Sequence, residues 1–348
     1  MSQRVSTMLV ASVLSVLLAG IGSLLHVPYV ALEPGPVTDT LGKRSDGVPL
    51  ISISGTRTYP TTGRLDLTTV AVAGGPPDPI TLITALRGWL DRSIAVVPQE
   101  LVYPPSESTK QVEQQNTQDM LNSQQSAITA ALGALHIPVQ TVVTVASVVK
   151  GKPADGRLQP GDVIRSIDGT PVTSTDSLRT LISRRLAGSA LRLEISRAGR
   201  LQTVQIRTVA DPADNNRPVI GITPGVRHVY PFKVSFGLQD VGGPSAGLMF
   251  ALGIVDKLTP GSLTGGRIIA GTGEISDDGT VSPIGGVQQK IVAARRAGAT
   301  IFLTPTENCS AAAAARPAGL ELVRVSQLAD ALHDLSLILA GRTGVPTC

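Results

Sequence analysis

The N-terminal part of the chain contains a long stretch without charge. No Asp, Glu, Lys or Arg occurs from Val5 to Leu25, and at 1.5 Å per residue a helix of this length crosses the roughly 30 Å core of a bilayer. Arg4 precedes the stretch, and the first charge after it is Glu33, so the positive-inside bias predicts a cytoplasmic N-terminus. We therefore expect residues 5–26 to be the transmembrane anchor of a single-pass cell-membrane protein whose bulk is extracytoplasmic.

A cleaved signal peptide is the alternative interpretation of this stretch. No clear Ala-x-Ala cleavage site follows the apolar core, although Leu18-Ala19-Gly20 leaves this alternative open.

The composition of the chain limits its function. A length of 348 residues allows two or three domains, and 42% hydrophobic residues suffice for their cores. The net charge of +4 comes from scattered arginines, and only 3% of residues are aromatic, so nucleic-acid binding is not expected. Cys309 and Cys348 form no metal-ligand cluster, and we expect neither a metal nor a cofactor. In an oxidising exterior these two cysteines could form one disulfide that holds the tail, residues 342–348.

A glycine-rich segment presents a serine ahead of an apolar helix. The segment reads Gly242-Gly243-Pro244-Ser245-Ala246-Gly247, and the apolar spacing predicts a helix from Ser245 to about Leu258. The glycines and Pro244 can hold a tight bend. Because the first N–H groups of a helix lack intrahelical partners, they can stabilise a developing oxyanion beside the serine.

A serine nucleophile needs a base, and a lysine is better placed than any histidine. The four histidines are His26, His136, His228 and His333, and none lies near the serine segment in sequence. On a helix that begins near Val287, Lys290 shares the apolar face, while Gln288, Gln289, Arg295 and Arg296 point elsewhere. Burial would lower the lysine pKa toward neutrality and make it a base. A lysine that reaches water from the edge of this face fits the periodicity equally well.

Several linked motifs resemble the proteolytic domain of the Lon protease family. They are Gly-Pro-Ser245-Ala-Gly, Gly271-Thr272-Gly273-Glu274-Ile275, Gly279-Thr280-Val281-Ser282-Pro283-Ile284-Gly285-Gly286 and Lys290. The resemblance implies a Ser-Lys dyad with Ser245 as nucleophile and Lys290 as general base, and it implies that the Thr272 hydroxyl orients the lysine. From the residues alone, Thr272 is equally well an ordinary strand threonine before a glycine turn.

The chain departs from the family pattern before the serine. Many Lon sequences carry an aspartate three residues before it, where this chain has Gly242, and Asp240 lies five residues before. We count Asp240, Gly243, Pro244 and Ala246 as supporting residues, and the departure puts the role of the acid and the resting geometry in doubt.

A second segment resembles a PDZ domain. It runs from Gly156 to Val172 and contains the turn dipeptides Pro160-Gly161 and Asp168-Gly169 on either side of a short strand, residues 163–167. A helix over residues 174–186 and strands over 190–196 and 201–208 are expected to follow. Such domains capture peptide ends or extended segments at a sheet edge. For the carboxylate-binding loop, residues 131–133 and 137–139 are candidates, although a helix end and a linker are the more ordinary interpretation.

The order of the segments predicts an α+β protein in which a PDZ domain is inserted into a split Lon-type proteolytic domain. Strands are expected over residues 50–53, 65–72, 229–236, 267–271, 301–303 and 322–325, and helices over 80–90, 106–135, 311–315 and from a Ser326 cap to about 340. The expected divisions are the anchor, residues 27–135 as the first part of the protease domain, 137–212 as the PDZ domain, a small β-barrel or sandwich with helices, and 217–341 as the catalytic part. Insertion into a surface loop is cheap when the ends of the insert lie close together.

The sequence therefore predicts a membrane-anchored serine endopeptidase that cleaves unfolded or extended extracytoplasmic polypeptides. No Gly-x-x-x-x-Gly-Lys-[Ser/Thr] phosphate loop occurs, so we expect cleavage without ATP. The PDZ domain would select substrate tails or regulate access, and the resemblance also implies a homo-oligomer. The alternative is a non-catalytic scaffold or adaptor in the cell envelope, because one fold can host several functions.

Overall fold

The computed structural model describes residues 3–238 and 241–348. Contacts divide the chain into two compact units, one made of Met1–Ile137 with Phe232–Cys348 and the other of Pro138–Pro231. Asp240, one of the predicted supporting residues, lies outside the described residues.

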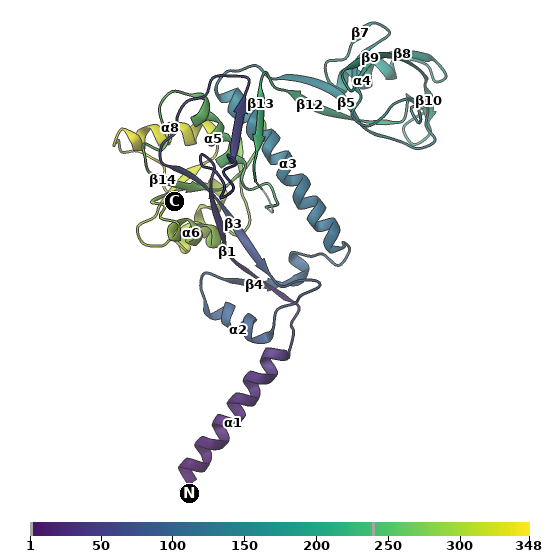
Figure 1. Ribbon diagram of the computed structural model, residues 1–348. Helices are drawn as coiled ribbons and strands as arrows, with labels where there is room; N and C mark the ends of the chain where they lie inside the picture. The colour runs from purple at the N-terminus through teal and green to yellow at the C-terminus, as the bar shows by residue number, and fades with distance from the viewer. Residues whose placement is uncertain (1–2, 239–240) are drawn as a thin grey trace. The chain divides into compact units, whose positions relative to one another are not determined.

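The first unit begins with the apolar helix α1 (Gln3–Leu24). Its window Thr7–Leu24 has a mean hydropathy of 2.1 and is almost entirely exposed (Figure 1). Within the described residues it is the one helix long and apolar enough to cross a membrane, and a signal sequence would share these properties.

The core of the first unit is a six-stranded sheet with the order β18-β17-β14-β3-β1-β4. β18, β17, β14 and β3 are mutually parallel, whereas β1 runs antiparallel to both β3 and β4. The strands are β1 (Tyr29–Asp39), β3 (Arg64–Ala73), β4 (Ala95–Pro98), β14 (Ile268–Gly271), β17 (Ile301–Pro305) and β18 (Glu321–Val325).

No strand was expected over β1, although this strand pairs with β3 along most of its length. Its middle contains Pro34-Gly35-Pro36, which is typical of a turn. The strand accommodates these residues with a register shift between Pro34 and Val37, because an irregular position in a ladder tolerates proline.

Helices cover both faces of this sheet. One face carries α5 (Gly247–Leu258), α3 (Thr109–Ala134) and α8 (Leu328–Leu339), which contact one another. The other carries α6 (Val287–Arg296) and the short α7 (Cys309–Ala314). The two faces are distinguished by neighbouring residues of β14, since Ala270 packs with α6 whereas a side chain at Gly271 would meet Met249 of α5.

Two short ribbons, two 3₁₀ turns and the helix α2 (Leu82–Leu90) complete the described part of this unit. β2 (Ile51–Ser54) pairs with β13 (Lys233–Phe236), and β15 (Glu274–Ile275) pairs with β16 (Val281–Ser282). The turns are η1 (Gln99–Leu101) and η2 (Thr306–Asn308). The expected single strand over residues 229–236 is wrong, because the chain breaks at Pro231, which lacks an N–H for a ladder.

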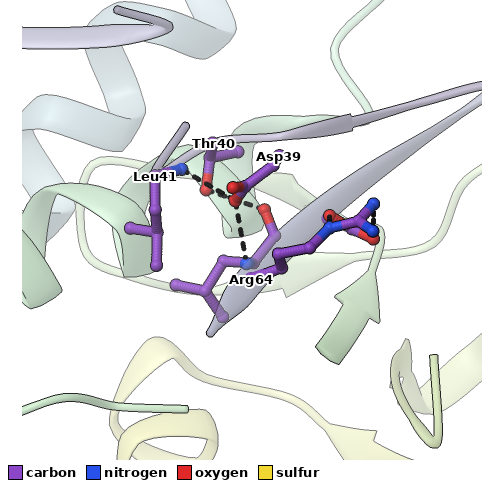
Figure 2. Close-up of polar contacts among 6 residues, drawn as sticks. Asp39, Thr40, Leu41 and Arg64 are labelled. Carbon is purple, nitrogen blue, oxygen red and sulfur yellow. Dashed lines mark hydrogen bonds and ion pairs between the residues drawn. The ribbon is translucent and has the colours of Figure 1, made fainter. Parts of the chain in front are cut away.

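Two carboxylates, of which Asp66 is buried, organise the start of β3. The Asp39 carboxylate accepts a hydrogen bond from the Leu41 N–H at 3.0 Å, as Figure 2 shows, and a second one from the Leu65 N–H at 3.1 Å. Arg64 pairs with the fully buried carboxylate of Asp66 at 2.7 Å. These contacts hold the turn after β1 against the strand that continues to the candidate site.

The C-terminal segment is tied to the edge of the sheet. Cys309 and Cys348 form a disulfide with their Cα atoms 5.1 Å apart, and the Cys348 N–H donates to the Leu322 carbonyl. The predicted Ser326 cap of the last helix is wrong: Gln327 is the N-cap, while the Ser326 hydroxyl donates to Asp330 at 2.6 Å.

The second unit is a small β-structure with one helix. Its strands follow the order β12-β5-β6-β8-β9, with β7 beside β6 and a separate ribbon β10-β11. The core consists of aliphatic side chains from these strands and from α4, including Leu178, Ile182, Leu191 and Leu193. The elements are β5 (Gln140–Val148), β6 (Val163–Ile167), β7 (Thr170–Pro171), α4 (Thr175–Ser183), β8 (Ala190–Arg197), β9 (Arg200–Arg207), β10 (Val209–Asp211), β11 (Arg217–Val219) and β12 (Ile222–Val229).

Candidate active site

The loop that carries Ser245 is held by α3. Gly243 adopts a φ of +83°, which favours glycine, and its N–H donates to the Asn116 carbonyl at 2.8 Å. The Ser123 hydroxyl donates to the Pro244 carbonyl at 2.8 Å. The expected helix start at Ser245 is two residues early, because Ala246 is the N-cap and α5 begins at Gly247.

Lys290 approaches this loop from α6. Of the two interpretations left open for Lys290, the structure shows burial: the residue is 3% exposed, and its Nζ lies 2.7 Å from the Ser245 Oγ. The prediction for Gln289 is wrong, since this residue is also buried. Gly286, in a left-handed conformation, lets the chain turn sharply into α6.

Thr272 links the two residues. The Nζ of Lys290 donates to its Oγ1 at 3.0 Å, and the Oγ1 donates to the Ser245 carbonyl at 3.0 Å. Because the Thr272 hydroxyl donates its proton to the Ser245 carbonyl, a lone pair on the Thr272 oxygen faces Lys290. The contact therefore fixes the lysine next to the serine hydroxyl.

Burial changes the acid–base behaviour of Lys290. Loss of hydration disfavours the ammonium form and lowers the pKa of Lys290 from 10.5 to about 7. A substantial neutral fraction near pH 7 follows, and a neutral amine 2.7 Å from a hydroxyl can accept its proton.

A pocket of about 470 Å³ opens over the serine and the lysine. Its walls come from β3, α3, the Ser245 loop and the start of α6. The lining residues are Pro36, Thr68, Thr69, Val70, Ala71, Val72, Met120, Val241, Gly242, Ser245, Ala246, Gly285 and Lys290.

The β3 wall of this pocket is an open strand edge. β14 ends at Gly271, opposite Leu67, while β3 continues to Ala73. In the ladders of the described residues, the part of β3 after Leu67 is paired with β1 alone. Its other edge offers backbone groups to an extended chain.

The structure brings together Ser245, Lys290 and Thr272, with Gly243, Pro244 and Ala246 in the loop around the serine. Sequence reasoning missed Ser123 and the β3 wall. Ser123 had one weak signal, because it is a small polar residue at helical spacing from the apolar Met120 and Ala127. In the part of the chain that the structure describes, no three His, Cys, Asp or Glu side chains are grouped as metal ligands would be.

The second unit has a groove of its own, of about 380 Å³. Leu178, Arg179 and Ile182 of α4 form one side, and residues 217–222 form the other together with Lys152. The two loop candidates from the sequence do not line it. Residues 131–133 lie in the last turn of α3, as the more ordinary interpretation held, and residues 137–139 connect α3 to β5.

Comparison with protein families finds two matches in the chain. Residues 231–335 match the Lon protease (S16) C-terminal proteolytic domain, and residues 121–208 match the PDZ domain. The chain carries a PDZ domain and a Lon-type proteolytic domain. The Lon-type match contains Ser245, Thr272 and Lys290 and supports a serine protease function.

Relatives named as Lon proteases match about a quarter of the chain. Lon protease 1 of Herpetosiphon aurantiacus is 41% identical over 94 residues, which cover 25% of this chain and 11% of the relative. Lon protease 1 of Bacillus subtilis is 36% identical over 91 residues, which cover 26% and 12%. The chain thus spans about a tenth of the length of these relatives. The solved PDZ domain of an SdrC-like protein from Listeria innocua is 28% identical, and the match covers 24% of this chain and 92% of that one, with a TM-score of 0.23.

Proposed function

We propose that this protein is a membrane-anchored serine endopeptidase that works without ATP, with Ser245 as nucleophile and Lys290 as general base. The observation that carries the proposal is the 2.7 Å separation between the Ser245 Oγ and the Nζ of a buried lysine. A nucleophile within hydrogen-bonding distance of a base, which a third group orients, is the arrangement that acyl transfer requires.

Acylation of Ser245 needs one proton to move between three atoms. Neutral Lys290 accepts the Ser245 proton as Oγ bonds to the substrate carbonyl carbon, and the carbonyl oxygen becomes an oxyanion. The lysine ammonium then protonates the leaving amine nitrogen, and the C–N bond breaks to leave a serine ester. Water, deprotonated by Lys290, attacks the ester, and the acid product leaves as Ser245 regains its proton.

The N–H groups at the start of α5 suit the oxyanion. Those of Ser245 and Ala246 make no backbone hydrogen bond within the described residues, and both adjoin the nucleophile. The positive end of the α5 dipole adds to their attraction for negative charge. We assign these two groups to the oxyanion.

An extended substrate fits the open edge of β3. Backbone pairing along residues 68–72 would bring a chain into the pocket regardless of its side chains. Only an unfolded or extended segment can add to an edge in this way, so folded globular proteins should resist cleavage.

The test is degradation of casein without ATP by the full chain in detergent, beside Ser245→Ala and Lys290→Ala. We expect both variants to lose cleavage, whereas Lys110→Ala, which changes an exposed lysine at the start of α3, keeps it. Cleavage by the Ser245→Ala variant would refute the assignment. If the parent chain neither cleaves casein nor reacts with a serine-directed probe, the envelope scaffold becomes the better proposal.

For the PDZ domain we propose capture of substrate tails in the groove between α4 and residues 217–222. Gly221 has a φ of +81°, and Lys152 adds positive charge for a terminal carboxylate, while the Arg217 guanidinium pairs with Asp214 at 2.6 Å. Leu178 and Ile182 provide the apolar wall for its side chains. Ile182→Arg should abolish binding of a peptide with a free C-terminus, and unchanged binding would place the ligand elsewhere.

A further inference from the structure

The helix α2 (Leu82–Leu90) has an unusual distribution of apolar side chains. Its buried face is made of Ala85 and Gly88, while Leu86, Trp89 and Leu90 on other faces are 47%, 55% and 88% exposed. An isolated helix of a soluble domain normally turns its large apolar residues inward. The exposed apolar face of α2 therefore indicates contact with something other than water.

This face is fixed to the end of α1. The Leu82 N–H donates to the Leu25 carbonyl at 2.8 Å, and the Val27 N–H donates to the Ile80 carbonyl at 3.0 Å. A side chain at Gly22 of α1 would lie 3.1 Å from Ile83 of α2. The exposed apolar surface of α1 thus continues onto α2, which Figure 1 shows beside the C-terminal end of α1.

Trp89 and the neighbouring charges suit a lipid headgroup layer. The Trp89 ring packs edge-on against Tyr29, with ring centroids 5.8 Å apart, so it is held at a fixed place on the surface. Arg87 and Arg92 are exposed beside it, and together with the Asp91 carboxylate, which accepts hydrogen bonds from the N–H and hydroxyl of Ser93, they leave one net positive charge. Tryptophan and arginine are the residues that anchor at the boundary between acyl chains and anionic headgroups.

We propose that α2 is an interfacial helix, which inserts Leu86, Trp89 and Leu90 into the outer surface of the same bilayer that α1 crosses. This inference rests on the proposed membrane anchoring and is independent of the proposed catalysis. The continuity of the apolar surface from α1 favours lipid over a protein partner, because any partner on this face would have to share it with the membrane.

The chain contains a single tryptophan, so its fluorescence reports on Trp89 alone. The full chain with Ser245→Ala would be reconstituted into vesicles of phosphatidylglycerol and phosphatidylcholine, with or without bromine on the acyl chains. We expect brominated lipid to reduce Trp89 emission several-fold, and acrylamide in the water to quench it weakly. Leu86→Ser combined with Leu90→Ser should restore emission in brominated vesicles and make it accessible to acrylamide. Leu186→Ser, at a residue of the second unit that is 81% exposed, should leave both readings unchanged.

Each other outcome overturns the proposal in a distinguishable way. Protein that floats with the vesicles but whose Trp89 responds only to acrylamide has an anchor and a free α2. Trp89 that responds to neither quencher is covered by protein, either a second copy or a partner. Protein that does not float with the vesicles refutes the anchor and α2 together, and the casein assay remains a separate test of the dyad.

Discussion

Lys290 sets the pH range in which the proposed site works. Its pKa is lowered to about 7 by burial, and only the neutral amine accepts the serine proton. We expect kcat/KM to rise with pH through about 7 and to level off above it, as measured on a short fluorogenic peptide. A rate that is flat from pH 6 to 9 (roughly the range around the expected limb) would exclude Lys290 as the base.

Thr272 is expected to act by positioning Lys290. Thr272→Val removes the acceptor 3.0 Å from Nζ, so the lysine loses its orientation and kcat should fall about tenfold or more. The ammonium form also loses a hydrogen bond, which lowers the pKa further and moves the pH–rate limb to lower pH. Thr272→Ser should restore both. If Thr272→Val lowers kcat without shifting the pH range in which the rate rises, Thr272 has only a structural role.

Asp66 should make the stability of the first unit depend on pH. Burial raises the pKa of Asp66 from 3.8 to about 6 despite the attraction of Arg64, so the folded chain binds this proton more tightly than the unfolded chain. The stabilisation is complete below the unfolded pKa and is lost as the pH rises through about 6, a difference of roughly 3 kcal/mol. In urea denaturation, Asp66→Asn should lose less stability than the parent chain between these pH values. If the variant and the parent chain lose equal stability over this pH range, Asp66 is not the source of the pH dependence.

At the scale of elements, α3 holds the Ser245 loop through Ser123. Ser123→Ala removes the hydrogen bond to the Pro244 carbonyl and should cost about 1 kcal/mol of stability. A small shift of a reacting group costs far more in rate, so we expect kcat to fall roughly tenfold to a hundredfold with KM little changed. Ser126→Ala, at a half-buried serine on the same helix, is the matched control. If both variants behave alike, α3 does not position the loop.

Periodicity and turn residues predict most elements, since they depend on local sequence. α6 begins at Val287 and β6 covers residues 163–167 as expected. β1 could not be predicted, because its prolines are tolerated only through a bulge against β3. The pairing of Ser245 with Lys290 was predicted from linked motifs. The β3 wall and the role of Ser123 could not be predicted, because they depend on which distant segments pack against the Ser245 loop, and no local sequence pattern specifies this packing.

At the scale of the molecule, the second unit can be removed without a gap. Gln140 and Val229, near its two ends, are paired across β5 and β12, so a short Gly-Ser linker can join residue 137 to 232. We expect this deletion to leave a cooperatively folding first unit that still cleaves casein but no longer distinguishes substrates by their C-terminal tails. Unchanged discrimination would refute the proposed role of the PDZ domain, and loss of cooperative unfolding would show that the two units depend on each other.

One strand, β3, connects the pocket over Ser245 to the region of α2, the helix beside α1. Val72 lines the pocket, and the next residue, Ala73, packs in the cluster that contains Ile80 and Ala85 of the α2 region. With α2 on the lipid surface, β3, which rises about 3.3 Å per residue, would hold Ser245 at a constant distance from the membrane. Cleaved membrane proteins should then retain stubs of nearly uniform length whatever their sequence, which mass spectrometry of the membrane fraction would reveal.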